Sequence, residues 1–214
     1  GKGNHQITSS WTSPNEYEDE EEVYMDVIYE TMLELTRSNI TFVGTGKDTT
    51  TTLGGFYIHN VENITFKNMT VTNTGHGIRM SDAKVELINV ALKGCSSHAL
   101  NISDPTSATT VVATRCEFAN SFYGAVIEGS LTSATFNNCV FHDNKQFGIY
   151  ASDNATIHLH GEATAIHSNG RYGIYAYKSG KVFIHLPSNH NTSYNNGRED
   201  RSTHRGGTIT NVED

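Results

Sequence analysis

A four-residue motif recurs along the chain and sets the pattern of apolar and polar positions. It consists of glycine or alanine, an apolar residue, a variable residue and a second apolar residue. The motif begins at Gly55, Gly77, Ala99, Gly124, Gly148 and Gly173, a spacing of about 22 to 25 residues. A fixed period in this range indicates a solenoid. Alternation of apolar and variable positions has the period of a β-strand. The chain is therefore predicted to be all-β, with one such strand in each coil.

A second and a third series of short segments repeat with the same period. In the second series the outer residues are apolar and the middle one is mostly polar; its members are 40–42, 64–66, 85–87, 111–113, 134–136, 157–159 and 182–184. The third series comprises 69–71, 90–92, 116–118 and 139–141. Three strands per coil predict a single-stranded right-handed parallel β-helix of about eight coils.

Asparagine recurs at the predicted turns. Asn73, Asn120, Asn144 and Asn169 each precede a motif glycine by four residues, and Asn68, Asn89 and Asn138 precede the third strand. Asparagine tolerates left-handed backbone conformations, and stacked coils are about 4.8 Å apart. We therefore expect these side chains to stack and to bond to one another.

These repeats resemble those of the pectin-lyase-like superfamily. The segment 38–46 (Ser-Asn-Ile-Thr-Phe-Val-Gly-Thr-Gly) is similar to its opening coil, and 3–7 (Gly-Asn-His-Gln-Ile) to its first strand. The resemblance covers nearly the whole chain and implies the same β-helical fold. The superfamily contains lyases, hydrolases, epimerases, phage tailspikes and adhesins, so the resemblance does not select an activity.

The chain is predicted to form one domain over residues 1–214, with regular coils at 33–187. Residues 13–32 interrupt the repeat. Ser13-Pro14-Asn15-Glu16 has the form of a capping box with proline at the first helical position, and Met25, Ile28, Tyr29 and Met32 are spaced for one helical face. We expect a helix, or an acidic insert, that covers the open end of the coil; cation binding is the alternative. Residues 188–214 are predicted to form a polar loop and a terminal strand.

Charge and composition exclude some partners. The net charge is −8, but six acidic residues lie within 16–22, and the remainder carries 15 basic and 17 acidic residues. Without a basic stripe, nucleic acid is not an expected partner. No segment approaches the roughly 18 apolar residues of a membrane span. Six Asn-x-Ser/Thr sequons favour an extracellular or cell-surface location.

Cys116 and Cys139 occupy equivalent positions in adjacent coils. They are predicted to form either stacked free thiols or a disulfide.

Two groups of residues have the composition of metal sites. Asp82, Asp104 and Glu128 follow the same strand in successive coils and could bind Ca²⁺ through hard oxygen ligands. The resemblance to pectate lyases implies Arg79 as the catalytic base of such a site; ordinary turn chemistry is the alternative. His158, His160 and His185 share one outward face and could bind a transition metal, or simply stack.

The sequence Gly75-His76-Gly77 resembles a motif of polygalacturonases. Those hydrolases also need an Asp-Asp pair, which this chain lacks, so the resemblance does not extend to their acid–base chemistry.

An amphipathic band follows the first strand series. One column precedes the motif glycine or alanine and contains His76, His98, Tyr123, Phe147 and Tyr172; Arg79, Tyr150 and Tyr175 point outward from the strands. Aromatic rings on a flat sheet suit sugar stacking or self-association, whereas ring stacking that only stabilises the sheet is the alternative.

These patterns predict a non-catalytic, extracellular solenoid that binds glycan or assembles with itself. A Ca²⁺-dependent polysaccharide lyase and a purely structural solenoid that stacks end to end are the alternatives.

Overall fold

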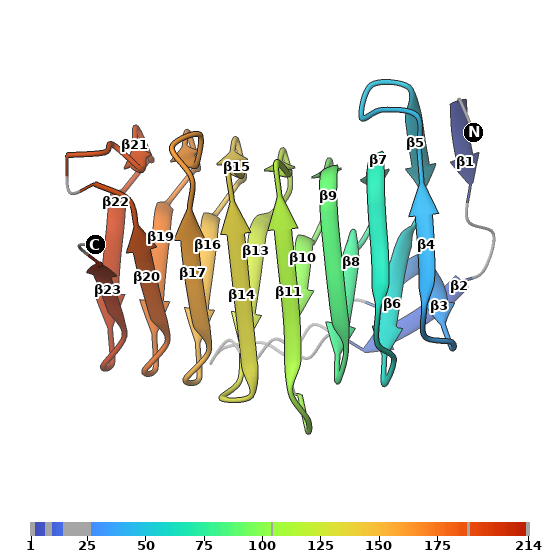
Figure 1. Ribbon diagram of the computed structural model, residues 1–214, viewed down its shortest axis with the longest axis horizontal. Helices are drawn as coiled ribbons and strands as arrows, with labels where there is room; N and C mark the ends of the chain where they lie inside the picture. The colour runs from blue at the N-terminus through green and yellow to red at the C-terminus, as the bar shows by residue number, and fades with distance from the viewer. Residues whose placement is uncertain (1–2, 7–9, 15–26, 104, 188, 213–214) are drawn as a thin grey trace.

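The computed structural model describes residues 3–6, 10–14, 27–103, 105–187 and 189–212. Over these residues the chain winds into a right-handed parallel β-helix, which confirms the predicted all-β fold (Figure 1). The coil makes about seven turns, one fewer than expected.

Three faces form the cross-section of the coil. The front face of Figure 1 contains β4 (Ile40–Val43), β7 (Ile64–Thr72), β9 (Lys84–Lys93), β11 (Thr109–Thr114), β14 (Thr132–Asn137), β17 (Thr156–His160), β20 (Lys181–His185) and β23 (Thr208–Asn211). The back face contains β2 (Ser10–Pro14), β3 (Val27–Leu35), β6 (Gly55–His59), β8 (Ile78–Ser81), β10 (His98–Ile102), β13 (Tyr123–Glu128), β16 (Phe147–Ser152), β19 (Tyr172–Tyr177) and β22 (Glu199–His204). The upper face contains β1 (Gly3–Gln6), β5 (Thr50–Leu53), the ends of β7 and β9, β12 (Glu117–Ala119), β15 (Val140–His142), β18 (Ala165–His167) and β21 (Ser193–Tyr194).

Asparagines shape the corner between the front and upper faces. In β7 and β9 the second and third predicted strands are continuous, and each bends at an asparagine. Asn68 and Asn89 have left-handed φ angles of 54° and 53°, and Asn89 Nδ2 donates to Asn68 Oδ1 at 2.9 Å. Residues with a Cβ are sterically disfavoured in this conformation, and asparagine tolerates it better than most because its side chain can bond locally, which explains why asparagine recurs there.

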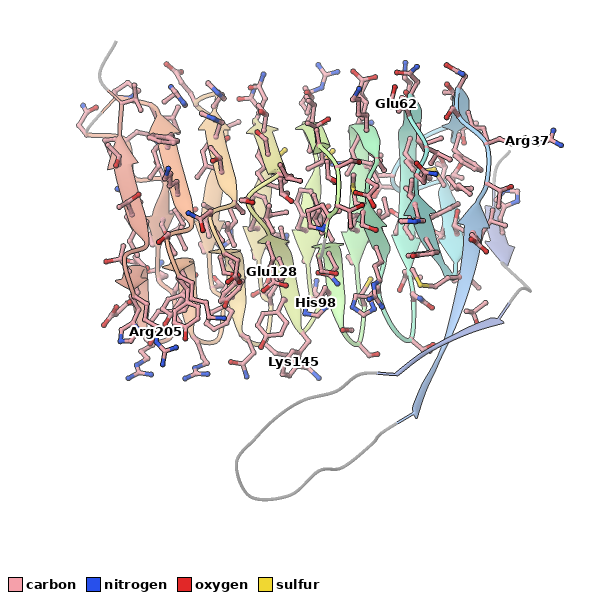
Figure 2. The ribbon with its side chains drawn as sticks, turned by 90° about the horizontal axis from the view of Figure 1, so that it is seen from below. Arg37, Glu62, His98, Glu128, Lys145 and Arg205 are labelled. Carbon is pink, nitrogen blue, oxygen red and sulfur yellow. The ribbon has the colours of Figure 1, made fainter. Side chains whose placement is uncertain are left out.

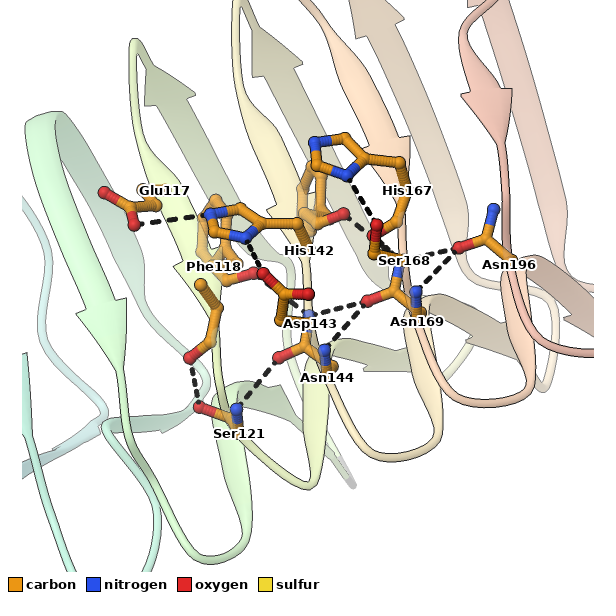
Figure 3. A network of polar contacts seen from close by, with 12 residues as sticks. Glu117, Phe118, Ser121, His142, Asp143, Asn144, His167, Ser168, Asn169 and Asn196 are labelled. Atoms are coloured by element: carbon orange, nitrogen blue, oxygen red, sulfur yellow. Dashed lines mark hydrogen bonds and ion pairs between the residues drawn. The ribbon is translucent and has the colours of Figure 1, made fainter.

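A chain of buried side-chain hydrogen bonds runs along one turn of successive coils (Figure 3). Asn144 Nδ2 donates to Asn169 Oδ1 at 2.9 Å, and Asn169 Nδ2 donates to Asn196 Oδ1 at 2.9 Å. In the preceding coil the backbone N–H of Ser121 donates to Asn144 Oδ1 at 3.1 Å. Asn120, which the spacing placed in this row, instead has a left-handed φ of 52°, so Ser121 takes the position beside Asn144.

In-register pairing stacks like residues in the core. Ile149 pairs with Ile174 and Leu159 with Ile184, each at the equivalent position of the next coil. All four side chains are buried. The outward members of the same strands are polar or aromatic, as the period-2 pattern predicted.

The predicted N-terminal helix is wrong where the structure describes it. Ser13 and Pro14 end β2, and β3 contains Ile28, Tyr29 and Met32; the two strands pair antiparallel. β3 also pairs in parallel with β6, so the segment bonds to strands on both sides instead of forming a helix. Residues 15–26, including the acidic run, lie outside the described residues. Within the described ranges no helix is long and apolar enough to cross a membrane.

The predicted polar loop at 188–207 is also corrected. β22 pairs in parallel with β19, from Tyr172 opposite Glu199 to Tyr177 opposite His204. Its residues are almost all exposed and polar, so the segment lacks the apolar alternation by which a strand is recognised. The terminal strand expected within 188–214 is β23 (Thr208–Asn211).

The two equivalent cysteines are buried free thiols rather than a disulfide. Cys116 Sγ lies 3.4 Å from the carbonyl oxygen of Leu87, and Cys139 Sγ lies 3.3 Å from that of Ala113. Burial raises the pKa of the Cys139 thiol, so this group stays protonated and behaves as a small apolar side chain.

Candidate functional site

The predicted outward column forms a continuous stack of rings on the back face. The centroid separations are 4.7 Å between His76 and His98, 4.9 Å between His98 and Tyr123, 5.2 Å between Tyr123 and Phe147, and 5.4 Å between Phe147 and Tyr172. His76, Phe147 and Tyr172 are only 2%, 8% and 9% exposed. The column therefore supports the sheet along much of its length and offers a ligand only part of its surface.

The rings at the C-terminal end of this column belong to a wider cluster. We call Phe147, Tyr150, Tyr172, Tyr175 and Tyr177 the aromatic patch. Tyr150 and Tyr175 are Cα partners in neighbouring strands, with ring centroids 5.8 Å apart. Tyr175 also lies 4.9 Å from Tyr172 and 6.0 Å from Tyr177. Tyr150, Tyr175 and Tyr177 are only partly buried, so the patch presents phenol groups to solvent.

Four cations border the aromatic patch. Arg171 and Arg198 lie 5.8 Å and 5.5 Å from the Tyr172 centroid, while Arg205 and Lys178 lie 5.3 Å and 5.7 Å from the Tyr177 centroid. These separations suit cation–π attraction. In Figure 2, Arg205 and Lys145 project along the same side of the coil as His98.

Sequence reasoning missed Tyr177 and these cations. Arg171 precedes Tyr172 in the motif, and the equivalent position of the next coil is Arg198, whose N–H donates to the Arg171 carbonyl. This recurrence was a usable signal.

The environment keeps the side chains of Tyr150, Tyr175 and His98 neutral. Burial raises the pKa of Tyr150 to about 12, with the Glu128 charge acting in the same direction, and burial also raises the pKa of Tyr175. Burial lowers the pKa of His98 well below its ordinary value, and the charges of His76 and Arg79 lower it further. Near neutral pH the phenols therefore remain hydrogen-bond donors and His98 is a neutral imidazole.

Two residues of the predicted Ca²⁺ column, Asp82 and Glu128, accept hydrogen bonds from protein groups. Asp82 Oδ1 accepts from the N–H groups of Thr106 and Ser107 at 2.8 and 2.6 Å, and its Oδ2 accepts from Thr106 Oγ1 at 3.0 Å. Glu128 Oε1 accepts from Ser152 Oγ at 3.0 Å. Asp104 lies outside the described residues. The Ca²⁺ site stays a prediction, while Asp82 clearly anchors the loop at 106–107.

Replacing Asp82 by asparagine is expected to destabilise the fold by about 1 to 2 kcal/mol at pH 7, because charge-assisted hydrogen bonds are weakened. Burial raises the pKa of Asp82, but the hydrogen bonds from Ser107 and Thr106 outweigh it and hold the pKa below its ordinary value. A depressed folded-state pKa contributes stability above roughly pH 4 that is lost as the pH falls through the folded value.

Urea denaturation of both proteins at pH 7 and near pH 2.5 measures this difference. The gap between them should narrow at the lower pH; a gap independent of pH contradicts the assigned role of the carboxylate. Repeating the pH 7 experiment with Ca²⁺ tests the predicted ion, which should stabilise the wild type and not Asp82→Asn.

Arg79, the base implied by the lyase resemblance, lies on β8 between Tyr57 and Asn101 of the neighbouring coils. Its side chain is partly buried, and its charge acts on His98. Glu128 is on a different part of the back face, where it lines an open cleft with Pro105, Gly129, Ser130 and Asp153. The structure therefore places Arg79 in the row of Tyr57 and Asn101, where its charge acts on the ring column through His98.

The three predicted histidines meet on the front face, opposite the aromatic patch. His160 and His185 are Cα partners in β17 and β20, with ring centroids 4.2 Å apart and planes inclined by 8°. His158 Nδ1 lies 2.9 Å from His185 Nε2. One ligand atom from each of the three lies within 4.8 Å of the others, the single group of this kind in the described ranges.

Comparison with known proteins agrees with this architecture. A family model described as "Right handed beta helix region" matches residues 27–166. The chain matches none of the curated protein sequences. Among solved structures, the periplasmic alginate epimerase AlgG has a TM-score of 0.51 at 13% identity, covering 77% of this chain and 49% of its own.

Two further structures share less of the geometry. A point mutant of AlgG has a TM-score of 0.48 at 14% identity, with 76% of this chain and 49% of its own covered. The catalytic domain of a GH87 α-1,3-glucanase in complex with nigerose has a TM-score of 0.29 at 12% identity, with 88% and 56% covered. The chain spans about half the length of these proteins, and the likeness shows the fold alone.

Proposed function

This chain belongs to the right-handed β-helix family, and we propose that it binds an anionic polysaccharide across the aromatic patch of its back face. The observation that carries this proposal is the juxtaposition of partly exposed Tyr150, Tyr175 and Tyr177 with arginines that lie against the same rings. Two neighbouring coils supply these tyrosines, so the patch extends along the axis of the coil, the direction in which a linear polymer can lie.

The tyrosines supply the contact with the sugar rings. An aromatic ring presents a flat apolar surface with a polar tip, which suits the apolar faces and the hydroxyl groups of a sugar. Tyr150 and Tyr175 lie side by side in neighbouring strands, so one chain of sugar units can contact both. Both phenols are protonated near neutral pH and can donate a hydrogen bond, and burial raises their pKa values further.

The arginines supply the preference for an anionic chain. Guanidinium groups form two parallel hydrogen bonds to a carboxylate, and Arg171, Arg198 and Arg205 are exposed at the border of the patch. Lys178 contributes less because its Nζ lies 3.6 Å from an Asp153 oxygen. A polyuronate matches this combination of rings and cations better than a neutral glucan.

We propose binding without catalysis, since of the described carboxylates on this side Asp82 holds a loop, while Glu128 and Asp153 share the Ser152 hydroxyl at 3.0 and 2.7 Å. An extracytoplasmic location is part of the proposal. It is supported by sequons whose asparagines are exposed, namely Asn39, Asn63, Asn154 and Asn191, although Asn101 is buried.

Replacing Tyr175 by alanine is expected to weaken polyuronate binding about tenfold, the loss of about 1.4 kcal/mol typical of an aromatic anchor. Calorimetric titration with polygalacturonate or alginate, and with neutral dextran, measures the affinity and the charge preference. Tyr194→Ala is the matched control, because Tyr194 is also partly buried but stacks on His167 of the upper face, and it should bind as the wild type does.

Equal affinity for dextran contradicts the anionic preference. Unchanged binding by Tyr175→Ala, or equal losses in both variants, contradicts the assigned face. The alternatives give other results. A lyase yields unsaturated product with ultraviolet absorbance in the presence of Ca²⁺, and a self-assembling solenoid shows a size that rises with concentration.

A further inference from the structure

We infer that His158, His160 and His185 form a binding site for a divalent transition-metal ion on the front face of the coil. The site needs no loop to close and no partner chain. Two of its members alternate along β17 and the third comes from β20 of the next coil, so regular parallel pairing brings the three imidazoles together.

The distances are close to those that a metal requires. Zinc binds histidine nitrogen at about 2.0 to 2.1 Å, so two ligand nitrogens stand about 2.9 Å apart at a right angle and about 3.4 Å apart at the tetrahedral angle. His158 Nδ1 and His185 Nε2 are 2.9 Å apart, and the set lies within 4.8 Å. Rotation of the partly buried His160 and His185 rings has to shorten the widest separation of 4.8 Å by about 1.4 Å to reach the tetrahedral spacing.

The short contact between His158 and His185 depends on where their ring hydrogens lie. The two facing nitrogens are 2.9 Å apart, and a hydrogen on one of them is donated to the other. When that hydrogen lies on the other nitrogen of its own ring, both facing nitrogens present lone pairs from neutral imidazoles, the form in which histidine is a ligand.

Neighbouring residues hold the cluster without filling it. The ring of Phe183 stacks on His158 at 5.2 Å with an 18° inclination, which restricts rotation of that imidazole. On the other side, Thr135 and Asn137 of β14 are the Cα partners of His158 and His160. Three imidazole ligands leave a further coordination position for water or an anion, as in three-ligand zinc sites.

The donor set indicates the class of ion. Three nitrogen ligands suit zinc, copper, nickel or cobalt, whereas calcium and magnesium need oxygen. This site is therefore distinct from the predicted Ca²⁺ column. It also lies on the opposite face from the aromatic patch (Figure 1), so the inference does not depend on glycan binding.

Calorimetric titration of the full 214-residue chain with zinc chloride, without any histidine tag, tests the site. We expect saturable binding of one ion, weakened at least about tenfold in His185→Gln, since even the partners of metal ligands change affinity by 10- to 100-fold. The matched control is His167→Gln, because His167 also stacks on a histidine of the neighbouring coil, His142, at 5.4 Å. It should bind zinc as the wild type does.

A second measurement keeps the test independent of the variant's folding. Co²⁺ added to the wild type should give visible absorption bands of nitrogen coordination that zinc displaces. Should His185→Gln lose its strand circular dichroism, His160→Gln takes its place. The absence of saturable zinc binding or of cobalt bands, or equal affinity in the variant and the wild type, overturns the inference.

Discussion

Replacing Phe141 by alanine is expected to lower the free energy of unfolding by about 3 to 5 kcal/mol, the usual cost of deleting a buried aromatic side chain. Phe141 is fully buried. Its ring stacks on Phe118 at 4.6 Å and meets Phe136 edge-on at 5.0 Å. The backbone ladders on both sides hold these neighbours at fixed spacing, so they cannot move far into the cavity.

Urea denaturation followed by circular dichroism measures this loss. Phe183→Ala removes a ring of the same size from the outer surface, where Phe183 is partly exposed and stacks on His158, and should cost about 1 kcal/mol or less. Similar losses of unfolding free energy in the two variants contradict the expected contribution of the buried Phe141 ring and its contacts with Phe118 and Phe136.

Replacing Asn169 by alanine is expected to cost about 2 to 4 kcal/mol, because several buried groups lose their partners at once. Asn169 is 1% exposed. Its Oδ1 accepts from the N–H and Nδ2 of Asn144 at 3.2 and 2.9 Å, and its Nδ2 donates to Asn196 Oδ1 and to the carbonyl of Phe141 (Figure 3). The alanine side chain has no polar atom to bond with these groups. It is also too small to fill the space that the asparagine side chain occupied.

Thermal and urea denaturation check this expectation against Asn191→Ala, in which an exposed asparagine is changed and stability should move by less than about 0.5 kcal/mol. Asn169→Asp should be at least as destabilising as alanine at pH 7: it keeps an acceptor for Asn144, but it buries a charge and turns an oxygen toward Asn196 Oδ1 and the Phe141 carbonyl. If alanine is tolerated as well as it is at Asn191, the hydrogen bonds do not stabilise the turn.

The candidate sites show what a repeat can and cannot predict. A repeat assigns each outward residue to a column, so the stacking of Phe147 on Tyr172 and of His160 on His185 followed from spacing. The contact between His158 and His185 runs diagonally between coils. This contact depends on the conformations of the two side chains, which the spacing does not predict. The arginines beside the aromatic patch lie in turns, where the sequence has no period-2 pattern.

The sequence by itself determined the architecture of the coil and the division into inward and outward residues. In-register parallel strands repeat the same environment every turn, so an apolar position in one coil is apolar in the next. Only the tertiary structure decided the path of segments whose pairing depends on neighbours: β3 beside β2 and β6, and β22 beside β19. Backbone hydrogen bonding to a neighbouring strand stabilises these segments. Because this pairing does not require alternating apolar residues, it cannot be recognised from the sequence.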